Sequence, residues 1–180
     1  METRACIETR RSIRKYEARP LPREVVESIV ALAAYAPSWK NTQVARYTVI
    51  TDRTVLEKIA EDCVLGFTHN AEIIRSCPAL AVQSTVTGRS GYERDGSFTT
   101  SQGTHWESFD AGISAQTFCL AAHDLGIGTC IMGIFDEKKL AEVIGLPEGE
   151  RASALIPMGY PAEDPKAPKR KEPDVLLRWL

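Results

Sequence analysis

The longest stretch of helical spacing constrains this chain more than any other feature. Residues 107–125, with the sequence ESFDAGISAQTFCLAAHDL, carry apolar or small side chains almost all the way round a helix. One side of that helix carries Phe109, Ile113, Gln116, Thr117 and Leu120. A helix without a broad polar face is normally buried, so we predict a central, buried helix with closely packed neighbours.

Shorter segments with clear periodicity lie on both sides of this helix in the sequence. Helical spacing predicts helices at residues 2–9, 22–36, 52–63, 71–75 and 136–144, with Asp52 and Asp136 as caps. Apolar, β-rich runs predict strands at residues 47–50, 78–86, 129–135 and 152–158. Because several helices follow one another, the pattern indicates an α+β fold with helices around one sheet.

Two further segments lack regular periodicity. Residues 87–103 are rich in Gly, Ser and Thr, and a loop of that length in a compact domain is usually functional or disordered. From Gly159 onward the chain is rich in Pro and Lys and ends on an apolar segment, residues 175–180. Such an extended arm needs an apolar surface to lie on, and a partner subunit would provide one; the alternative is a frayed terminus.

The bulk properties fit one globular domain spanning residues 1–180, without internal repeats. The formal net charge of −2 excludes a general attraction to nucleic acid or to an anionic membrane. No apolar run approaches the roughly 18 residues of a membrane span, and residues 1–14 lack the apolar core of a signal peptide. We therefore expect a cytoplasmic protein that binds neither nucleic acid nor membrane.

Self-sufficient catalytic motifs are missing from the sequence. None of the five cysteines forms a C-x-x-C pair, no histidine spacing suits a metal, and neither a G-x-S-x-G elbow nor a phosphate loop occurs. Gly126-Ile127-Gly128 begins like a dinucleotide fingerprint, but it ends a helix instead of opening one. We expect no metal site and no catalytic side chain, so that a cofactor would carry the chemistry.

Two basic clusters indicate a phosphate. Arg10, Arg11, Ser12 and Arg14 offer planar cations and a hydroxyl, and Lys169-Arg170-Lys171 lies near the other terminus. The two clusters would bind one phosphate group if the two ends of the chain met. The alternative is that each cluster is a solvated surface.

Six motifs resemble the nitroreductase family, in the right order and over nearly the whole chain. They are R-R-S-x-R-x-[FY] at residues 10–16, A-P-S-x-x-N-x-Q at 36–43, a D-A-G-x-A-x-Q-like segment at 110–116, L-G-[LI]-G-[ST]-C at 125–130, G-x-F-D at 133–136, and G-Y-P at 159–161 with a basic tail at 168–171. The resemblance implies a nitroreductase-like fold, with a mainly antiparallel central sheet, an extended arm at residues 160–180 and an intertwined homodimer.

The resemblance also implies non-covalent FMN at the dimer interface, with NAD(P)H as reductant and flavin N5 as the reactive atom. Residues of the same subunit would hold the phosphate and ribityl chain: Arg10, Arg11, Ser12, Arg14, Lys169 and Lys171. Others would surround the ring: Asn70 and Ile131, Met132, Gly133 and Ile134 from that subunit, and Pro37, Ser38 and Asn41 from its partner. A small oxidant would contact Trp39, Tyr92, Phe98 and Trp106, whose alternative role is ordinary packing.

Two departures from the family pattern affect the surroundings of the ring. Val44-Ala45 replaces a frequent Pro-Trp, and Gly133-Ile134 replaces a frequent pair of glycines. The most direct hypothesis is a ping-pong oxidoreductase that reduces nitroaromatics or quinones. The alternatives are dehalogenation, flavin fragmentation or heterocycle oxidation on the same fold, or a regulatory dimer that binds flavin without turnover. The sequence leaves open the physiological oxidant, the preference between NADH and NADPH, and a redox role for Cys130.

Overall fold

A four-stranded antiparallel sheet forms the centre of the molecule. The computed structural model describes residues 1–180, and its strands lie in the order β1-β2-β4-β3. The strands are β1 (Ala45–Ile50), β2 (Ala79–Val86), β3 (Gly128–Thr129) and β4 (Glu150–Gly159). The α+β class and the antiparallel sheet predicted from the sequence are confirmed.

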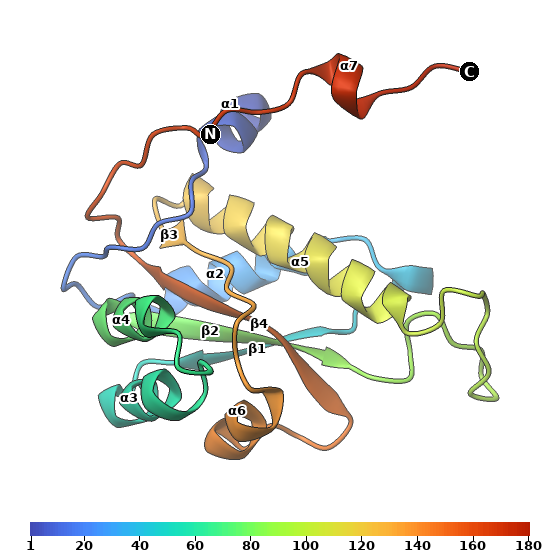
Figure 1. The fold of residues 1–180 in the computed structure, drawn as a ribbon, viewed down its shortest axis with the longest axis horizontal. Coiled ribbons are helices and arrows are strands. Elements are labelled where there is room, and N and C mark those ends of the chain that lie inside the picture. Colours follow the sequence, from blue (N-terminus) through green and yellow to red (C-terminus); the bar gives the residue numbers. More distant parts are fainter.

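Helices cover both faces of this sheet (Figure 1). Helices α2 (Arg23–Ala33) and α5 (His105–Asp124) lie on one face, and α3 (Arg53–Asp62), α4 (Thr68–Ser76) and α6 (Glu137–Ile144) lie on the other. Two short helices are close to the termini, α1 (Thr3–Thr9) and α7 (Pro173–Leu176). Asp52 and Asp136 cap α3 and α6 through hydrogen bonds from backbone amides, as the sequence predicted.

The two layers of helices enclose separate apolar cores. Because side chains alternate along a strand, β2 directs Ala79 and Ala81 toward α2 and α5, and Leu80 and Val82 toward α3, α4 and α6. Small residues on the α5 side let that helix approach the sheet closely. Its Phe118 is fully buried there and stacks on Tyr47, with 4.8 Å between the ring centroids.

The prediction of full burial for the central helix is wrong for one of its faces. The side that carries Phe109 and Ile113 lies away from the sheet, and Phe109 is 59% exposed. The opposite side packs on the sheet, where Ala111, Ala115, Phe118 and Ala122 are buried. A mainly apolar surface on α5 therefore stays uncovered in the single chain.

Several predicted segments differ from the structure at their ends; α4, predicted at residues 71–75, begins three residues earlier, and two further differences bear on the site. The helix predicted at residues 22–36 ends at Ala33, because the chain turns there toward the loop that follows Pro37. The strand predicted at residues 129–135 is a two-residue strand, Gly128–Thr129. Beyond it the Cys130 amide donates to the Pro157 carbonyl oxygen at 3.3 Å, and Met132 forms a bridge with Leu155. Ile131 and Ile134 point outward instead of packing in a sheet interior.

The segment at residues 87–104, which joins β2 to α5, is compact although it contains no helix or strand. The amide of Glu93 donates to the Ser97 carbonyl oxygen at 2.8 Å, and the amide of Thr99 donates to the Gly91 carbonyl oxygen at 2.9 Å. Gly91 has φ +85°, and a Cβ there would lie 2.7 Å from the Gly103 oxygen, so only glycine allows the close approach.

The C-terminal arm begins beside the N-terminal segment. Tyr16 forms an antiparallel bridge with Pro161, and the amide of Ala162 donates to the Lys15 carbonyl oxygen at 3.0 Å. The arm then runs past α1 and carries α7 away from the body of the molecule (Figure 1). Its apolar end is exposed, with Trp179 at 86%. None of the helices has both the length and the apolar character needed to cross a membrane.

Candidate functional site

The N-terminal basic cluster lies along the edge of the sheet. Ser12 forms a parallel bridge with Thr129 of β3, and the amide of Ile13 donates to the Thr129 carbonyl oxygen at 2.9 Å. Gly128 makes this approach possible, because a Cβ there would lie 2.7 to 2.9 Å from the Ile13 side chain. The pairing places Ser12 directly beside the start of residues 130–134.

Electrostatic effects indicate that the arginines gather at this edge. Burial raises the pKa of the Cys130 thiol, while Arg14, the Ser12 hydroxyl and Arg10 lower it. Burial also lowers the pKa of His123, and Arg10 and Arg11 lower it further. Cys130 is therefore held as a neutral thiol at neutral pH, in surroundings made positive by the arginines.

The guanidinium groups of the cluster form no ion pair with a carboxylate. Arg11 is committed to the backbone, since its Nη1 donates to the carbonyl oxygens of Glu8 and Arg10 at 2.8 and 2.9 Å. Arg14 donates from Nη1 to the Ser12 carbonyl oxygen at 3.2 Å. The Arg10 side chain makes no hydrogen bond within the chain, so its guanidinium is the one most available to an anion.

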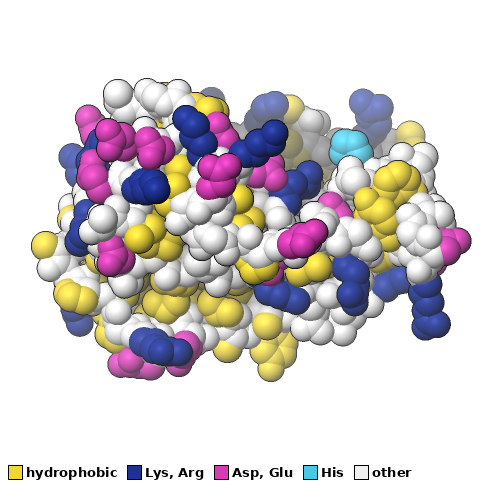
Figure 2. Space-filling model, turned by 90° about the horizontal axis from the view of Figure 1, so that it is seen from below, with side chains coloured by type: hydrophobic (Ala, Val, Ile, Leu, Met, Phe, Trp, Pro, Cys, Tyr) yellow, Lys and Arg dark blue, Asp and Glu magenta, His cyan; other side chains and the backbone are white.

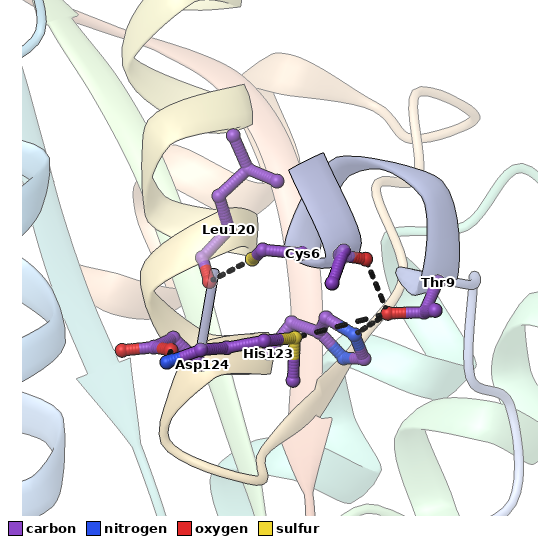
Figure 3. A network of polar contacts seen from close by, with 7 residues as sticks. Cys6, Thr9, Leu120, His123 and Asp124 are labelled. Atoms are coloured by element: carbon purple, nitrogen blue, oxygen red, sulfur yellow. Dashed lines mark hydrogen bonds and ion pairs between the residues drawn. The ribbon is translucent and has the colours of Figure 1, made fainter. Parts of the chain in front are cut away.

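Helix α1, which precedes this cluster, is held on the last turns of α5 by the contacts in Figure 3. The Cys6 thiol donates to the Leu120 carbonyl oxygen at 3.5 Å, and the Met1 amino group pairs with Asp124. Thr9 Oγ1 donates to the Ala5 carbonyl oxygen at 2.7 Å and lies 2.8 Å from His123 Nε2. Because a hydroxyl has one proton, His123 Nε2 is the donor to Thr9. These contacts fix the end of α1, directly before Arg10 in the chain.

Residues 131–134 form an open apolar surface next to the cluster. Met132 is buried and exchanges backbone hydrogen bonds with Leu155 at 2.8 and 3.0 Å, which anchors the segment. Ile131 and Ile134, beside it, are 48% and 45% exposed. A Cβ on Gly133 would meet nothing within 4 Å, and the amides of Gly133 and Ile134 donate to no acceptor of the chain. The segment thus combines apolar side chains with free donors.

Asn70, a second predicted ring contact, lies on α4. Its residue exposure is only 6%, and its side-chain amide makes no hydrogen bond within the chain. An amide that is free of intramolecular partners, on a largely buried residue, suits a contact with a polar ligand group.

The loop at residues 37–43 lies elsewhere and has an unusual backbone. Lys40, Asn41 and Gln43 all have positive φ values, 45°, 55° and 49°, which are disfavoured for residues other than glycine. The Ser38 hydroxyl accepts a hydrogen bond from the Gln43 amide at 2.9 Å and closes the loop. Backbone strain of this kind concentrates at functional sites.

The predicted oxidant residues form two separate aromatic pairs. Trp39 packs on Trp106 with 4.6 Å between the ring centroids, and Trp106 packs edge-on to Phe109 at 5.5 Å. Tyr92 packs on Phe98 at 4.9 Å within the 87–104 segment. The first group runs from the strained loop to the exposed face of α5.

One chain does not bring all the predicted site residues together. The 37–43 loop is attached to Asp110, near the start of α5, whereas the N-terminal basic cluster lies beside His123, near its end. Thirteen residues of helix separate these positions by roughly 20 Å. Lys169 and Lys171 are exposed on the arm and make no ion pair.

The sequence analysis gave no role to two residues that organise the site. Asp110 accepts one hydrogen bond from the Trp39 amide of the 37–43 loop and another from the Ser90 hydroxyl of the 87–104 segment. In the sequence it is marked by the D-A-G motif and by its position within an apolar helix, neither of which indicates these two partners. Glu163 accepts hydrogen bonds from the amides of Arg14 and Lys15 at 2.6 and 3.2 Å and ties the arm to the basic cluster. Nothing in the sequence of the Pro-rich tail indicates that Glu163 makes these contacts.

The surface charge is mixed on the face that carries α3 and α6. Figure 2 shows Lys and Arg side chains interspersed with Asp and Glu there, so this face presents no broad field of one sign. The local cluster at Arg10 is thus the more distinctive charged feature.

Comparison with known proteins supports a relationship over most of the chain. The model of the Nitroreductase family matches residues 7–160. The chain is 32% identical over 178 residues to a Methanothermobacter thermautotrophicus protein named NADH dehydrogenase/NAD(P)H nitroreductase, covering 97% of this chain and 85% of that protein. It is also 26% identical over 184 residues to the iodotyrosine deiodinase of Haliscomenobacter hydrossis, covering 92% of this chain and 82% of the relative.

Solved structures share the architecture. A nitroreductase family protein from Clostridium novyi NT has a TM-score of 0.77 at 28% identity, covering 93% of this chain and 89% of the other. A Desulfovibrio desulfuricans protein described as a nitroreductase in complex with FMN has a TM-score of 0.77 at 24% identity, covering 100% of this chain and 98% of the other. The similarity of both structures extends through almost the entire chain.

Proposed function

The chain belongs to the nitroreductase family, and from that premise we propose that it is a homodimeric, FMN-dependent NAD(P)H oxidoreductase that reduces small planar oxidants. The oxidants would be nitroaromatics, quinones or similar compounds. The observation that carries this proposal is the position of Arg10 and Ser12 beside the open surface of residues 131–134. A phosphate donor set beside β3 and an apolar surface for the ring at residues 131–134 therefore lie next to each other.

The residues at this edge fit a phosphorylated flavin. Arg10, Ser12 and Arg14 would bind the phosphate, since the two guanidinium groups form no ion pair within the chain and can provide charge-assisted donors. Lys169 and Lys171 would add charge from the arm, whose start Glu163 already holds beside Arg14. Asn70 and the free amides of Gly133 and Ile134 would hydrogen-bond the polar edge of the ring. Arg11, which is occupied by the backbone, would contribute mainly through its charge.

Bound FMN would supply two-electron transfer between NAD(P)H and the oxidant. The chain itself would hold the ring against Ile131 and Ile134 and would leave its other side open to planar molecules. Amide donors directed at the ring edge would favour negative charge there. No side-chain acid or base is required, in keeping with the neutral thiol at Cys130.

Dimer formation would complete this site. The 37–43 loop lies about 20 Å from the N-terminal basic cluster on one chain, at the opposite end of α5. If two copies packed the uncovered faces of α5 antiparallel around a twofold axis, the loop of one would approach the cluster of the other. Pro37, Ser38 and Asn41 would then contact the partner's flavin, and the apolar end of each arm would lie on the other subunit. Exposure of Phe109 and Trp179 in the single chain supports this arrangement.

Anaerobic absorbance spectroscopy of the purified protein tests the function directly. We expect a flavin spectrum, either as purified or after addition of FMN, that NADH or NADPH bleaches and a quinone restores. Because reductant and oxidant would use one open ring face in turn, double-reciprocal plots should be parallel. A protein that stays colourless in excess FMN would contradict the proposal.

A second candidate function follows from the deiodinase relative. The aromatic group of Trp39 and Trp106 would also suit a halogenated phenol. Halide release from iodotyrosine, measured with the dithionite-reduced enzyme and compared with quinone turnover, separates the two reactions. Bound FMN that neither NADH nor NADPH bleaches, without halide release, would instead indicate a regulatory flavoprotein.

A further inference from the structure

Asp110, the first residue of the D-A-G segment, is a buried carboxylate that is not among the proposed flavin contacts. It is on the first turns of α5 and is only 4% exposed. Its Oδ2 accepts a hydrogen bond from the Trp39 backbone amide at 2.9 Å and another from the Ser90 hydroxyl at 2.6 Å. The carboxylate has no cationic partner, so these donors are what stabilise it.

The two donors come from segments far apart in the sequence. Trp39 lies in the strained 37–43 loop, and Ser90, which is fully buried, lies in the compact 87–104 segment. A second contact joins the same two segments at the surface, where Lys40 Nζ pairs with Glu93 at 3.1 Å. The exposed pair contributes little by itself, whereas the buried carboxylate makes two charge-assisted bonds. Asp110 therefore makes the main polar contact that joins the 37–43 loop to the 87–104 segment.

The hydrogen bond from Trp39 to Asp110 also sets the position of the Trp39 and Trp106 side chains. The Trp39 backbone is fixed by Asp110, and its ring packs on Trp106, one turn before Asp110 on the same helix. A loop with three positive φ values would relax toward commoner backbone angles if that amide were released. Movement of Trp39 would then separate the two indoles.

We propose that Asp110 is a positioning residue for the oxidant site, holding Trp39 against Trp106 as the aromatic wall that a planar oxidant contacts. This inference rests on the proposed function, because it assigns the wall to the oxidant and not to the flavin. Asp110 itself would touch neither substrate nor cofactor. The wall would select flat aromatic oxidants over aliphatic ones, since stacking requires an extended π surface.

Steady-state kinetics tests the assignment. We expect Asp110→Ala to raise the KM for a quinone about tenfold or more. The Kd for FMN and the KM for NAD(P)H, which depend on the same loop and the same ring face, should rise by smaller factors. Asp110→Asn, which keeps the shape but loses the charge, should give a smaller rise, and Ser90→Ala should give the smallest. Asp62→Asn on exposed α3 is the matched control and should leave all three quantities unchanged.

Tryptophan fluorescence tests the same contact without flavin. In a Trp179→Phe background, which leaves Trp39 and Trp106, Asp110→Ala should shift the emission of the flavin-free protein to longer wavelength and increase acrylamide quenching. The Asp110→Asn and Ser90→Ala variants keep the measurement possible if the alanine variant does not fold. A lower Tm with unchanged quenching and unchanged quinone KM would show a merely structural role and overturn the proposal.

The two experiments separate failure of this inference from failure of the proposed function. A wild-type protein that binds no FMN would contradict the proposed function, and with it the assignment of the wall to an oxidant. The quenching measurement would then still decide whether Asp110 positions Trp39. If FMN binds and Asp110→Ala weakens FMN instead of the quinone, the proposed function stands and the positioning role for the oxidant is wrong.

Discussion

Among single residues, Arg10 differs from its neighbours because its guanidinium makes no hydrogen bond within the chain. Replacing it by alanine should remove one charge-assisted contact with a phosphate and cost roughly 1.5–3 kcal/mol of binding free energy. We therefore expect Arg10→Ala to raise the Kd for FMN about 10- to 100-fold, measured by flavin fluorescence quenching. Binding of riboflavin, which has no phosphate, should hardly change.

Arg4 provides the matched control for this prediction. It lies on α1, is exposed, and pairs with Glu8 at 2.8 Å, so Arg4→Ala removes an equal charge from the helix that precedes the cluster without touching the cluster. A Kd for FMN that is equal in Arg10→Ala and Arg4→Ala would show that Arg10 is only a surface charge.

His123 should make the stability of the flavin-free protein depend on pH. Burial and the nearby Arg10 and Arg11 lower its pKa below the ordinary 6.5, so the folded state resists protonation. Since the unfolded chain takes up the proton first, this contribution to stability is present above pH 6.5 and declines as the pH falls toward the lowered pKa. His123→Gln keeps a donor for Thr9 and should lose less stability than the wild type over that interval. Urea unfolding at about pH 7.5 and pH 5.5 measures the difference, and identical losses in both proteins would count against it.

At the scale of elements, the pairing of the N-terminal segment with β3 depends on one glycine. A Cβ on residue 128 would lie 2.7 to 2.9 Å from Ile13, which sits between Ser12 and Arg14. Gly128→Ala should therefore lower the free energy of unfolding by about 1–3 kcal/mol and also weaken FMN, because the segment must shift as a unit. Urea midpoints and FMN titration measure the two effects. A stable variant with wild-type affinity would show that the contact relaxes without moving the arginines.

At the scale of the whole molecule, the uncovered face of α5 should be a subunit interface. A charge placed at its centre, Ile113→Asp, would have to be buried on association, which is strongly unfavourable. We expect this variant to be a folded monomer by size-exclusion chromatography with light scattering, with FMN binding largely lost. Leu65→Asp is the control, since Leu65 is 65% exposed between α3 and α4 and its φ of 53° suits aspartate. A wild-type protein that is itself monomeric would refute the interface.

Much of the element order followed from local patterns. The apolar spacing of residues 107–125 predicted α5, and Asp52 and Asp136 marked the starts of α3 and α6 correctly, because capping involves only neighbouring residues. Ile131 and Ile134 misled the strand prediction, since β-branched side chains favour a strand whether or not a neighbouring strand is available. Here neither isoleucine pairs with β4, whereas Met132 between them forms a bridge with Leu155.

Local patterns in the sequence were enough to establish the class of fold, the helix at the centre and the residue types that a phosphate requires, because each depends on spacing over a few turns or on the chemistry of single side chains. Tertiary structure alone decided which side of α5 the sheet covers, that Ser12 lies beside Thr129, and that Asp110 joins Trp39 to Ser90. These contacts join residues 20 to 117 positions apart. Their existence depends on how layers of helix and strand pack, and no local periodicity records that packing.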